Sequence, residues 1–498
     1  MDPFQHHPFG TRIPNTLHAV CSSLPTIADV VAYEEKHPHS RNALTSGYPR
    51  FVEHFYVRQL AEYLKKEKGL DGQIVFPLAS NRYLDPLQIF LDRPLKAIEG
   101  EGFCAVHLPE QDRSTCQKIQ AFIQHVGGRI SSRQAEDLLL KKGLIAEPQT
   151  EAFYNGDAKS IILHKLRSIF KVESSEDILL CNSGMNAFYA TFQTVNAIQK
   201  PRGKNLWLQL GWIYTDTYKI LRELNPNKTT PIEVLDIFDR QNLEKVFTEQ
   251  GQQIAGIICE VPTNPLIQTC DLTQLQELAQ KHGAVLVIDP TISSPQNIEV
   301  LPYADVVVNS LTKYASSQGD VMAGTIVLNQ LSRFYSELKT NVKEYSQPLY
   351  IRDTQRLALE IEDYESVVNA TNTNTLKLVE FLEGRPSIRK VYWAYEERSR
   401  ANYEALARGT AMPGACLTIE LNTSFVDFYD TARVVKGPSF GTIFTMMCPY
   451  MYLAHYNLAG NLEGRESLRK KGLDPELVRI SVGIEDSDSL INVFSEVL

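Results

Sequence analysis

A lysine preceded by two hydroxyl side chains follows an apolar segment in the middle of the chain. Residues 284–289 read Ala-Val-Leu-Val-Ile-Asp, and Ser310-Leu-Thr-Lys313 comes after a second apolar segment. A lysine amine becomes a useful Schiff-base former when its surroundings lower its pKa, and Lys313 could then hold the aldehyde of pyridoxal 5'-phosphate (PLP). Ser310 and Thr312 would face the phosphate, while Asp289 would keep the pyridine nitrogen protonated. Lys313 and Asp289 together therefore predict a PLP site in which the cofactor ring can accept electrons from a substrate carbanion.

Each of these residues has an ordinary alternative when it is taken alone. A Thr-Lys pair after a strand occurs by chance in many proteins, and Asp289 could simply cap a turn before Pro290. Their order and spacing, however, resemble those of the Cys/Met-metabolism branch of the aspartate-aminotransferase-fold PLP enzymes, which includes cystathionine gamma-synthase and cystathionine gamma-lyase. The resemblance implies a fold type I α/β enzyme with PLP as its cofactor and with Thr291 as a further cofactor contact.

A small-residue turn upstream is the expected phosphate site. Leu179–Met185 reads as an apolar strand that runs into a turn and then a helix. The backbone N–H groups of Gly184 and Met185 would point at an anion there. A plain strand-to-helix turn is the default interpretation of Ser-Gly-Met alone, and the order of the family motifs is what makes it resemble a phosphate cup.

Two further segments resemble cofactor-binding motifs of the same family. Tyr214-Thr-Asp-Thr-Tyr218 is similar to a Tyr-Gly-Gly-Thr segment, which implies that the Tyr214 ring stacks on the pyridine and takes part in catalysis beside Lys313. An ordinary core aromatic is the alternative. Glu260–Pro265 is similar to the segment whose asparagine contacts the phenolic oxygen, which assigns Asn264 to the cofactor. Asn-Pro is otherwise a common turn signal.

The substrate residues that the resemblance implies lie near the C-terminus. Leu477–Glu485 looks like the strand whose arginine binds the substrate carboxylate, and the planar donors of Arg479 suit a bidentate contact. Ser439 falls where the family places a serine near the substrate carboxylate and the lysine, although a Gly-Pro-Ser turn is a simple alternative. Phe444 replaces an acidic residue that is usual in shorter members, which leaves the distal end of the substrate open.

The first 150 residues exceed the short members of the family. In those members a Tyr-x-Arg segment reaches the phosphate of the neighbouring subunit, and Tyr154 has the corresponding place here, but Gly156 replaces the arginine. The resemblance still assigns Tyr154 to the substrate. Upstream, Tyr48-Pro-Arg50 carries the full pattern and is followed by a helix-like stretch and an apolar strand. We predict a diverged internal repeat in which Tyr48 and Arg50 replace the lost phosphate contact; an extended turn of no chemical importance is an equal alternative.

Apolar strands alternate with helix-like segments between about residues 160 and 330. This alternation predicts a mostly parallel sheet with helices on both faces. The predicted strands are 177–181, 205–208, 254–259, 285–288, 305–308 and 324–328. We expect an N-terminal extension over 1–150, a large PLP-binding domain over 151–335 and a small α+β domain over 336–498.

Composition limits the classes of partner. With 498 residues and 43% hydrophobic content the chain can bury the cores of two or three domains, and its net charge of −9 argues against nucleic acid or an anionic membrane surface. The eight cysteines show no Cys-x-x-Cys spacing and the eleven histidines show no metal-ligand spacing, so no metal is expected. No apolar run is long enough to span a membrane. We expect a cytoplasmic enzyme acting on small amino-acid substrates.

The likeness is greatest to long, fungal-type cystathionine gamma-synthases, which also resemble the chain at Thr45–Phe51 and Lys436–Thr442. This implies that Lys313 removes a Cα proton before a group leaves Cγ. Addition of a thiol such as cysteine would give γ-replacement on an O-activated homoserine, a step of transsulfuration and methionine biosynthesis. The leading alternative is γ-elimination from cystathionine or from a γ-halogenated amino acid, which uses the same residues. The family also implies a homo-oligomer, either a dimer or a tetramer.

Overall fold

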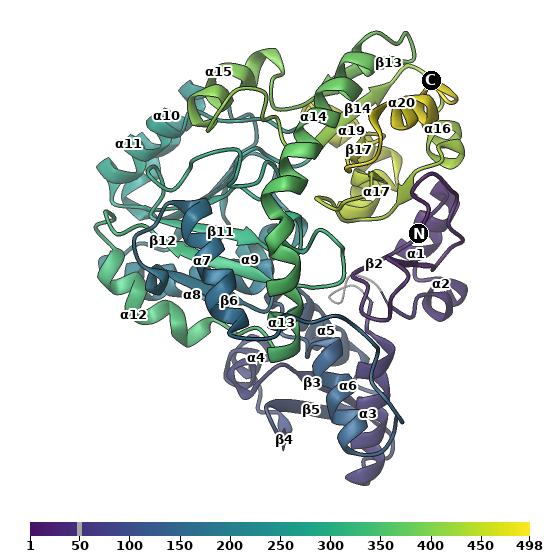
Figure 1. The fold of residues 1–498 in the computed structure, drawn as a ribbon. Coiled ribbons are helices and arrows are strands. Elements are labelled where there is room, and N and C mark those ends of the chain that lie inside the picture. The colour runs from purple at the N-terminus through teal and green to yellow at the C-terminus, as the bar shows by residue number, and fades with distance from the viewer. Residues whose placement is uncertain (47–51) are drawn as a thin grey trace.

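The computed structural model describes residues 1–46 and 52–498. Tyr48 and Arg50 fall outside the described residues, so their predicted phosphate contact stays a prediction. Figure 1 shows a central sheet with helices around it, a C-terminal block (green to yellow) on one side and an N-terminal block (purple to blue) on another.

The central sheet has seven strands in the order β6-β12-β11-β10-β9-β7-β8. Strands β8, β7, β9, β10 and β11 are parallel to one another, whereas β12 is antiparallel to both β11 and β6. The bounds are β6 Ile178–Cys181, β7 Leu206–Leu210, β8 Ile232–Val234, β9 Ile254–Glu260, β10 Val285–Asp289, β11 Val306–Ser310 and β12 Gly324–Leu328. The predicted mostly parallel sheet is confirmed; the short strand β8 was not predicted.

Both faces of this sheet are buried, which explains its continuous apolar runs. In β10, Val285 and Val287 pack into one core, while Leu286 and Ile288 pack into the other. One face is covered by α7 Ala158–Phe170, α10 Arg240–Gln250, α11 Leu272–His282 and α13 Ile351–Glu360, and the other by α8 Gly184–Gln199, α9 Thr215–Glu223 and α12 Tyr335–Tyr345. Helix α12, which begins at residue 335, shares the core of α8; the predicted domain bounds stay a prediction.

The N-terminal block packs directly on the α8 face of the large domain. Its Phe76 and Phe122 share a core with Phe188 and Trp207. It has an antiparallel sheet of order β3-β5-β4, made of β3 Gln73–Leu78, β4 Lys96–Gly100 and β5 Phe103–Pro109, with helices α3 Phe55–Glu67, α4 Leu84–Leu91, α5 Arg113–Val126 and α6 Ser132–Lys141. The order helix, strand, turn, helix does parallel α7, β6 and α8. However, β3 lies in a separate antiparallel sheet, so the internal repeat stays a prediction.

The first residues of the chain run between the N-terminal and C-terminal blocks (Figure 1). They form β1 Arg12–Ile13, β2 Cys21–Ser22, α1 Ile27–Glu34 and α2 Pro38–Ala43. Ile13 and Cys21 pack with Val435, Phe444 and Met446 in a small apolar core. The chain's beginning is thereby anchored to its C-terminal part.

The C-terminal block is built on a five-stranded sheet of order β13-β14-β17-β16-β15. Its strands are β13 Ile388–Tyr392, β14 Cys416–Leu421, β15 Val435–Lys436, β16 Met446–Pro449 and β17 Val478–Ser481. Its helices are α14 Tyr364–Glu383, α15 Glu397–Leu406, α16 Phe425–Thr431, α17 Tyr450–Ala454, α18 Tyr456–Ala459, α19 Leu462–Lys470 and α20 Ser487–Ser495. Strand β17 carries Arg479 at the centre of this sheet.

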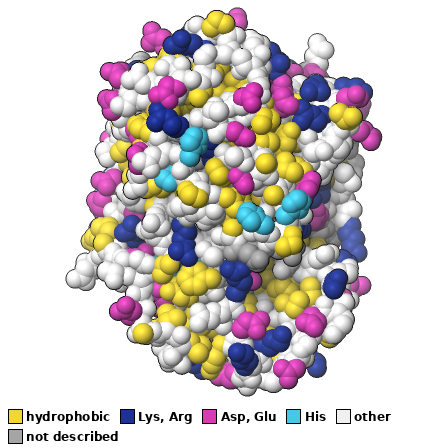
Figure 2. Space-filling view, turned by 90° about the vertical axis from the view of Figure 1, so that its right-hand side faces the viewer, with side chains coloured by type: hydrophobic (Ala, Val, Ile, Leu, Met, Phe, Trp, Pro, Cys, Tyr) yellow, Lys and Arg dark blue, Asp and Glu magenta, His cyan; other side chains and the backbone are white. Residues whose placement is uncertain are grey.

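Within the described ranges, no helix is both long and apolar enough to cross a membrane. The same residues contain no group of three or more His, Cys, Asp or Glu side chains suited to a metal ion. Figure 2 shows the face that is on the right in Figure 1, where acidic and basic side chains are interspersed.

Candidate active site

A pocket lies at the carboxyl edge of the parallel strands, where open α/β sheets place their ligands. Strands β9, β10 and β11 are parallel, so their last residues Glu260, Asp289 and Ser310 meet at this edge. The space between these strand ends and the segments around them forms the pocket. Its lining residues are Gly127, Ser183, Gly184, Met185, Phe188, Tyr214, Thr217, Glu260, Asn264, Asp289, Thr291, Ile292, Ser310, Thr312, Lys313, Met322 and Phe440.

Lys313 enters this pocket from the segment that follows β11. Its side chain is buried, and Nζ donates a hydrogen bond to Oγ of Ser439 at 3.2 Å. Nζ also lies 4.6 Å from the centre of the Phe440 ring. The fold thus brings the predicted lysine and the predicted serine into contact, although 126 residues separate them.

Asp289 ends β10 on the pocket wall. Its Oδ1 accepts hydrogen bonds from the backbone N–H of Thr291, at 2.9 Å, and from the Thr291 hydroxyl. Burial raises the pKa of Asp289 to about 6, an effect that the bonds from Thr291 and the charge of Lys313 partly oppose. A cation beside this carboxylate would favour its ionised form. Thr291 Oγ1 also accepts the Ser310 N–H at 3.0 Å, so this threonine joins the ends of two strands.

The predicted anion cup forms at the start of α8. Ser183 caps the helix by accepting the N–H of Asn186 at 3.0 Å, which leaves the N–H groups of the first turn directed at the pocket. A Cβ added to Gly184 would lie 2.8 Å from Cβ of Ser310, so only glycine fits beside this strand end. The helix start and the Ser310 side chain therefore meet around a space suited to a phosphate.

Thr312 also lines the pocket, but its hydroxyl has a partner within the protein. Oγ1 donates to the carbonyl oxygen of Ala323 at 3.1 Å and accepts the N–H of Ala323 at 3.0 Å. In this arrangement Thr312 closes the loop that follows Lys313. Ser310 is the hydroxyl better placed for a phosphate.

Arg479 reaches the opposite end of the site from β17. Its side chain is buried; Nη1 donates to Oδ1 of Asn264 at 3.2 Å and Nη2 donates to the carbonyl oxygen of Ser439 at 3.1 Å. The guanidinium lies between the rings of Phe440 and Tyr450, at 4.9 and 5.2 Å from their centres. Such a fixed, planar cation is suited to binding a carboxylate.

Glu260 is a buried carboxyl group in the pocket to which the sequence argument gave no role. Its Oε1 accepts the backbone N–H of Tyr214 at 2.5 Å, which anchors the backbone at the start of α9. Burial, together with the nearby Asp289, holds the pKa of Glu260 well above its ordinary value, while Arg479 acts in the opposite direction. Glu260 lies four residues before the predicted cofactor residue Asn264 in the sequence, and this position could have indicated that it belongs to the site.

Other lining residues were also missed. Ser183 directly precedes Gly184 and has the residue type of a helix N-cap, which was a usable signal. Gly127 had none, because it ends α5 in the N-terminal block; a Cβ added there would lie 2.1 Å from Oγ of Ser183. Tyr154, in contrast, lies away from this pocket, where its N–H donates to the carbonyl oxygen of Gln355 at 3.1 Å. Its substrate contact stays a prediction.

Comparison with known proteins identifies the family. The model of the Cys/Met metabolism PLP-dependent enzymes matches residues 160–498. The chain belongs to this family. It is 35% identical, over 97% of both chains, to the L-2-amino-4-chloropent-4-enoate dechlorinase/desaturase of Streptantibioticus cattleyicolor. It is 36% identical to the cystathionine gamma-synthase of Neurospora crassa over 65% of this chain and 52% of that protein.

Solved structures support the same fold. The cystathionine gamma synthase of Xanthomonas oryzae pv. oryzae, in complex with aminoacrylate and cysteine, matches with a TM-score of 0.58 and 20% identity over 68% of this chain and 85% of the other. The fold type I architecture and the PLP cofactor predicted from the sequence are confirmed. The chain is therefore a PLP-dependent enzyme of the cystathionine gamma-synthase and gamma-lyase family.

The residues present fit PLP. Gly184 leaves room for a phosphate at the start of α8, Lys313 offers an amine to the aldehyde, and Asp289 offers a carboxylate to the ring nitrogen. The protonated ring nitrogen would supply the positive charge that the buried Asp289 lacks. Arg479 lies next to Ser439, whose hydroxyl accepts a hydrogen bond from Lys313; its contact with a substrate carboxylate stays a prediction.

Proposed function

We propose that this enzyme removes a leaving group, such as a halide, from Cγ of a γ-substituted amino acid by elimination. The single observation that carries the proposal is the 35% identity, over 97% of both chains, to a dechlorinase/desaturase whose named substrate has chlorine on C4, which is the γ carbon. Sequence reasoning favoured γ-replacement with a thiol, with this elimination as its alternative.

The lining of the pocket supports a neutral substrate side chain. Among the described lining residues, Lys313 is the only cation. A succinyl or phosphoryl leaving group carries negative charge and would need a further cation beside it. The lining residues that are not assigned to the cofactor include Phe188, Ile292, Met322 and Phe440, which suit an apolar, halogenated carbon chain.

The chain's own residues account for the proposed steps. When bound, PLP supplies a ring that accepts the electrons left as a proton departs from Cα. Arg479 binds the substrate carboxylate, and Asp289 holds a proton on the ring nitrogen. Nζ of Lys313, oriented by Ser439, takes the Cα proton. A second proton then leaves Cβ to a base, the halide departs from Cγ with the bonding electron pair, and one of the two protons is returned to carbon. The net change is loss of one hydrogen halide, without an oxidant.

The test is product analysis with the PLP-loaded enzyme. We expect L-2-amino-4-chloropent-4-enoate to release chloride and to give an organic product lighter by one HCl, measured with a halide electrode and mass spectrometry. Lys313→Ala should abolish both signals, while Lys339→Ala, a lysine on α12 that pairs with Asp177, should not. An unchanged substrate in the presence of active cofactor would reject the proposal.

The second candidate is γ-replacement, in which a thiol adds at Cγ. The 36% identity to a cystathionine gamma-synthase over 65% of the chain favours it. It predicts that O-acetyl-, O-succinyl- or O-phosphohomoserine gives cystathionine only when cysteine is present. Formation of 2-oxobutyrate without cysteine would support elimination instead. We also propose a homo-oligomer, which light scattering of the purified enzyme tests.

A further inference from the structure

The loop that carries Lys313 is held by residues from the first 150 positions of the chain. This lysine loop, residues 313–323, begins at the catalytic lysine and includes Met322, which lines the pocket. The carbonyl oxygens of Gly319 and Asp320 are adjacent in the loop. The first accepts the N–H of Val20 at 3.0 Å, and the second accepts Nη1 of Arg133 at 3.0 Å.

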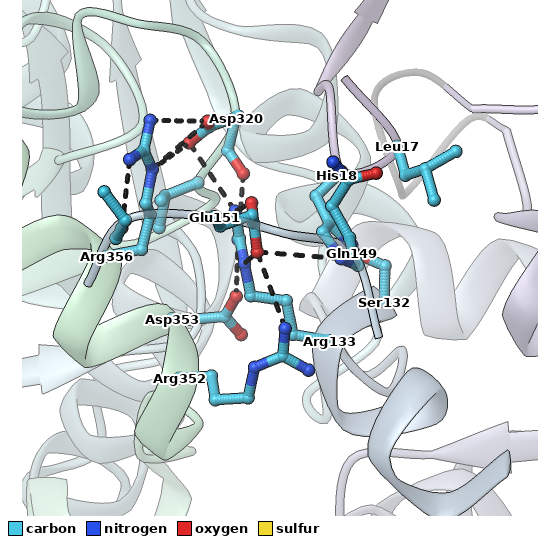
Figure 3. A network of polar contacts seen from close by, with 12 residues as sticks. Leu17, His18, Ser132, Arg133, Gln149, Glu151, Asp320, Arg352, Asp353 and Arg356 are labelled. Carbon is cyan, nitrogen blue, oxygen red and sulfur yellow. Dashed lines mark hydrogen bonds and ion pairs between the residues drawn. The ribbon is translucent and has the colours of Figure 1, made fainter. Parts of the chain in front are cut away.

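Arg133 and His18, which lies two residues before Val20, belong to one buried polar network (Figure 3). His18 contacts Oγ of Ser132 through Nδ1 at 2.9 Å, and Ser132 directly precedes Arg133. Arg133 is only 1% exposed. It binds Glu151 in bidentate fashion, through Nε at 2.9 Å and Nη2 at 2.6 Å. The segment around His18 and Val20 and helix α6 are thus joined to each other, and together they bind the adjacent carbonyls of Gly319 and Asp320.

The charges around Arg133 fix the orientation of its guanidinium. Nη1, besides its bond to the Asp320 carbonyl, donates to Oδ1 of Asp353 at 2.9 Å, and Nη2 lies 3.6 Å from the Asp320 carboxylate. Arg356 donates to the same Asp320 carboxylate at 2.9 Å. A buried fork with partners on its three nitrogens has one low-energy orientation, so the carbonyl that it binds is held firmly.

We propose that Arg133 is a positioning residue for the lysine loop. By fixing the Asp320 carbonyl it places Met322 against the cofactor pocket and keeps Ala323 on Thr312, which lies beside Lys313. Arg133 does not touch the substrate or PLP in this account. Its effect is on how tightly the pocket holds PLP and on the surroundings of the lysine amine, and it is independent of the reaction that the enzyme catalyses.

Arg133→Lys is the informative variant, and Arg352→Lys is its matched control. Lysine keeps the positive charge but cannot make the fork of donors. Arg352 belongs to the same network, with Nη1 2.7 Å from Glu136 and 2.6 Å from Asp137 and Nη2 3.6 Å from Glu151; these three carboxylates lie outside the lysine loop. Both substitutions should lower the melting temperature of the cofactor-free enzyme, so melting temperature alone does not separate the two roles.

The affinity for PLP and the absorbance spectrum of bound PLP distinguish a positioning role from a merely structural one. We expect Arg133→Lys to raise the Kd of PLP for the apoenzyme, measured by fluorescence titration, by about tenfold, the effect of losing one hydrogen bond from a charged donor. It should also shift the pH dependence of the visible absorbance of bound PLP. Arg352→Lys should change neither. Equal effects of the two variants, or an unchanged Kd in Arg133→Lys, would overturn the proposal.

A second variant keeps the proposal testable if Arg133→Lys does not fold. Glu151→Gln removes the charge that orients the Arg133 fork but leaves the guanidinium in place. We expect a smaller rise in the Kd of PLP, by about threefold, because a neutral amide still accepts one of the two bonds. A Kd equal to that of the natural protein would reject the positioning role of Arg133.

Discussion

Replacing Asp289 by asparagine should stabilise the cofactor-free enzyme at neutral pH. Burial raises the pKa of Asp289 from its ordinary value of 3.8 to about 6, against the opposing effects of Thr291 and Lys313. The ionised carboxylate therefore costs folding free energy, about 3 kcal/mol at about 1.36 kcal/mol per pH unit. Asparagine is neutral, has nearly the same shape, and still accepts the N–H of Thr291 through Oδ1.

The pH dependence of this stabilisation has a definite sign. Because the pKa is raised in the folded state, the contribution of the bound proton is fully present below pH 3.8 and is lost as the pH rises to about 6. Asp289→Asn removes that loss. Its advantage over the natural protein should be near zero at the acid end, grow between these two pH values and stay constant above them.

Denaturant unfolding of the two apoenzymes across this pH range measures the difference. Asp177→Asn is the control of opposite sign, because hydrogen bonds from Tyr335 and Lys339 outweigh burial and lower the pKa of Asp177, so its loss should destabilise the protein above the acid range. With PLP added, Asp289→Asn should lose its advantage, since the partner of the ring nitrogen is gone. The reasoning would be refuted if the Asp289→Asn apoenzyme were less stable than the natural apoenzyme, or if the difference in their free energies of unfolding were the same at every pH.

Three further substitutions test other parts of the site. Gly184→Ala should raise the Kd of PLP by about tenfold or more in equilibrium dialysis, because the new Cβ would lie 2.8 Å from Ser310 and close the anion cup. Arg479→Lys should raise KM by about tenfold or more in steady-state kinetics while the Kd of PLP stays constant, since lysine cannot keep both the Asn264 bond and a bidentate carboxylate contact. Lys313→Ala should leave no pyridoxyl adduct in mass spectra after borohydride reduction, whereas the natural protein should show one.

The large sheet could be predicted from the sequence because its strands are buried on both faces. Val285–Asp289 has no polar residue before its last position, and that position delivers Asp289 to the pocket. The anion cup was predictable for a similar reason, since Gly184 begins a helix and only two residues separate it from the end of a strand. In these places a local pattern and a functional residue coincide.

The rest of the site depends on contacts that leave no local signal. Gly127 reaches Ser183 from the N-terminal block, and Phe440 meets Lys313 from the C-terminal block. The bond from Arg133 to the Asp320 carbonyl joins positions 187 residues apart, and the acceptor is a backbone atom that every residue type has. No periodicity or spacing encodes such a pair, so it emerges only when the blocks are packed together.

The N-terminal block packs against the large sheet and shares a continuous apolar core with it. The solved cystathionine gamma synthase covers 68% of this chain, whereas the dechlorinase/desaturase relative matches 97% of it. The block shares the core of α8 through Phe122, places Gly127 on the pocket wall and binds the lysine loop at Asp320 through Arg133. Removing it would expose the apolar face of α8 and would also remove the bond from Arg133 to the loop that carries Lys313. The position of the Lys313 loop therefore depends on contacts that residues of the N-terminal block make.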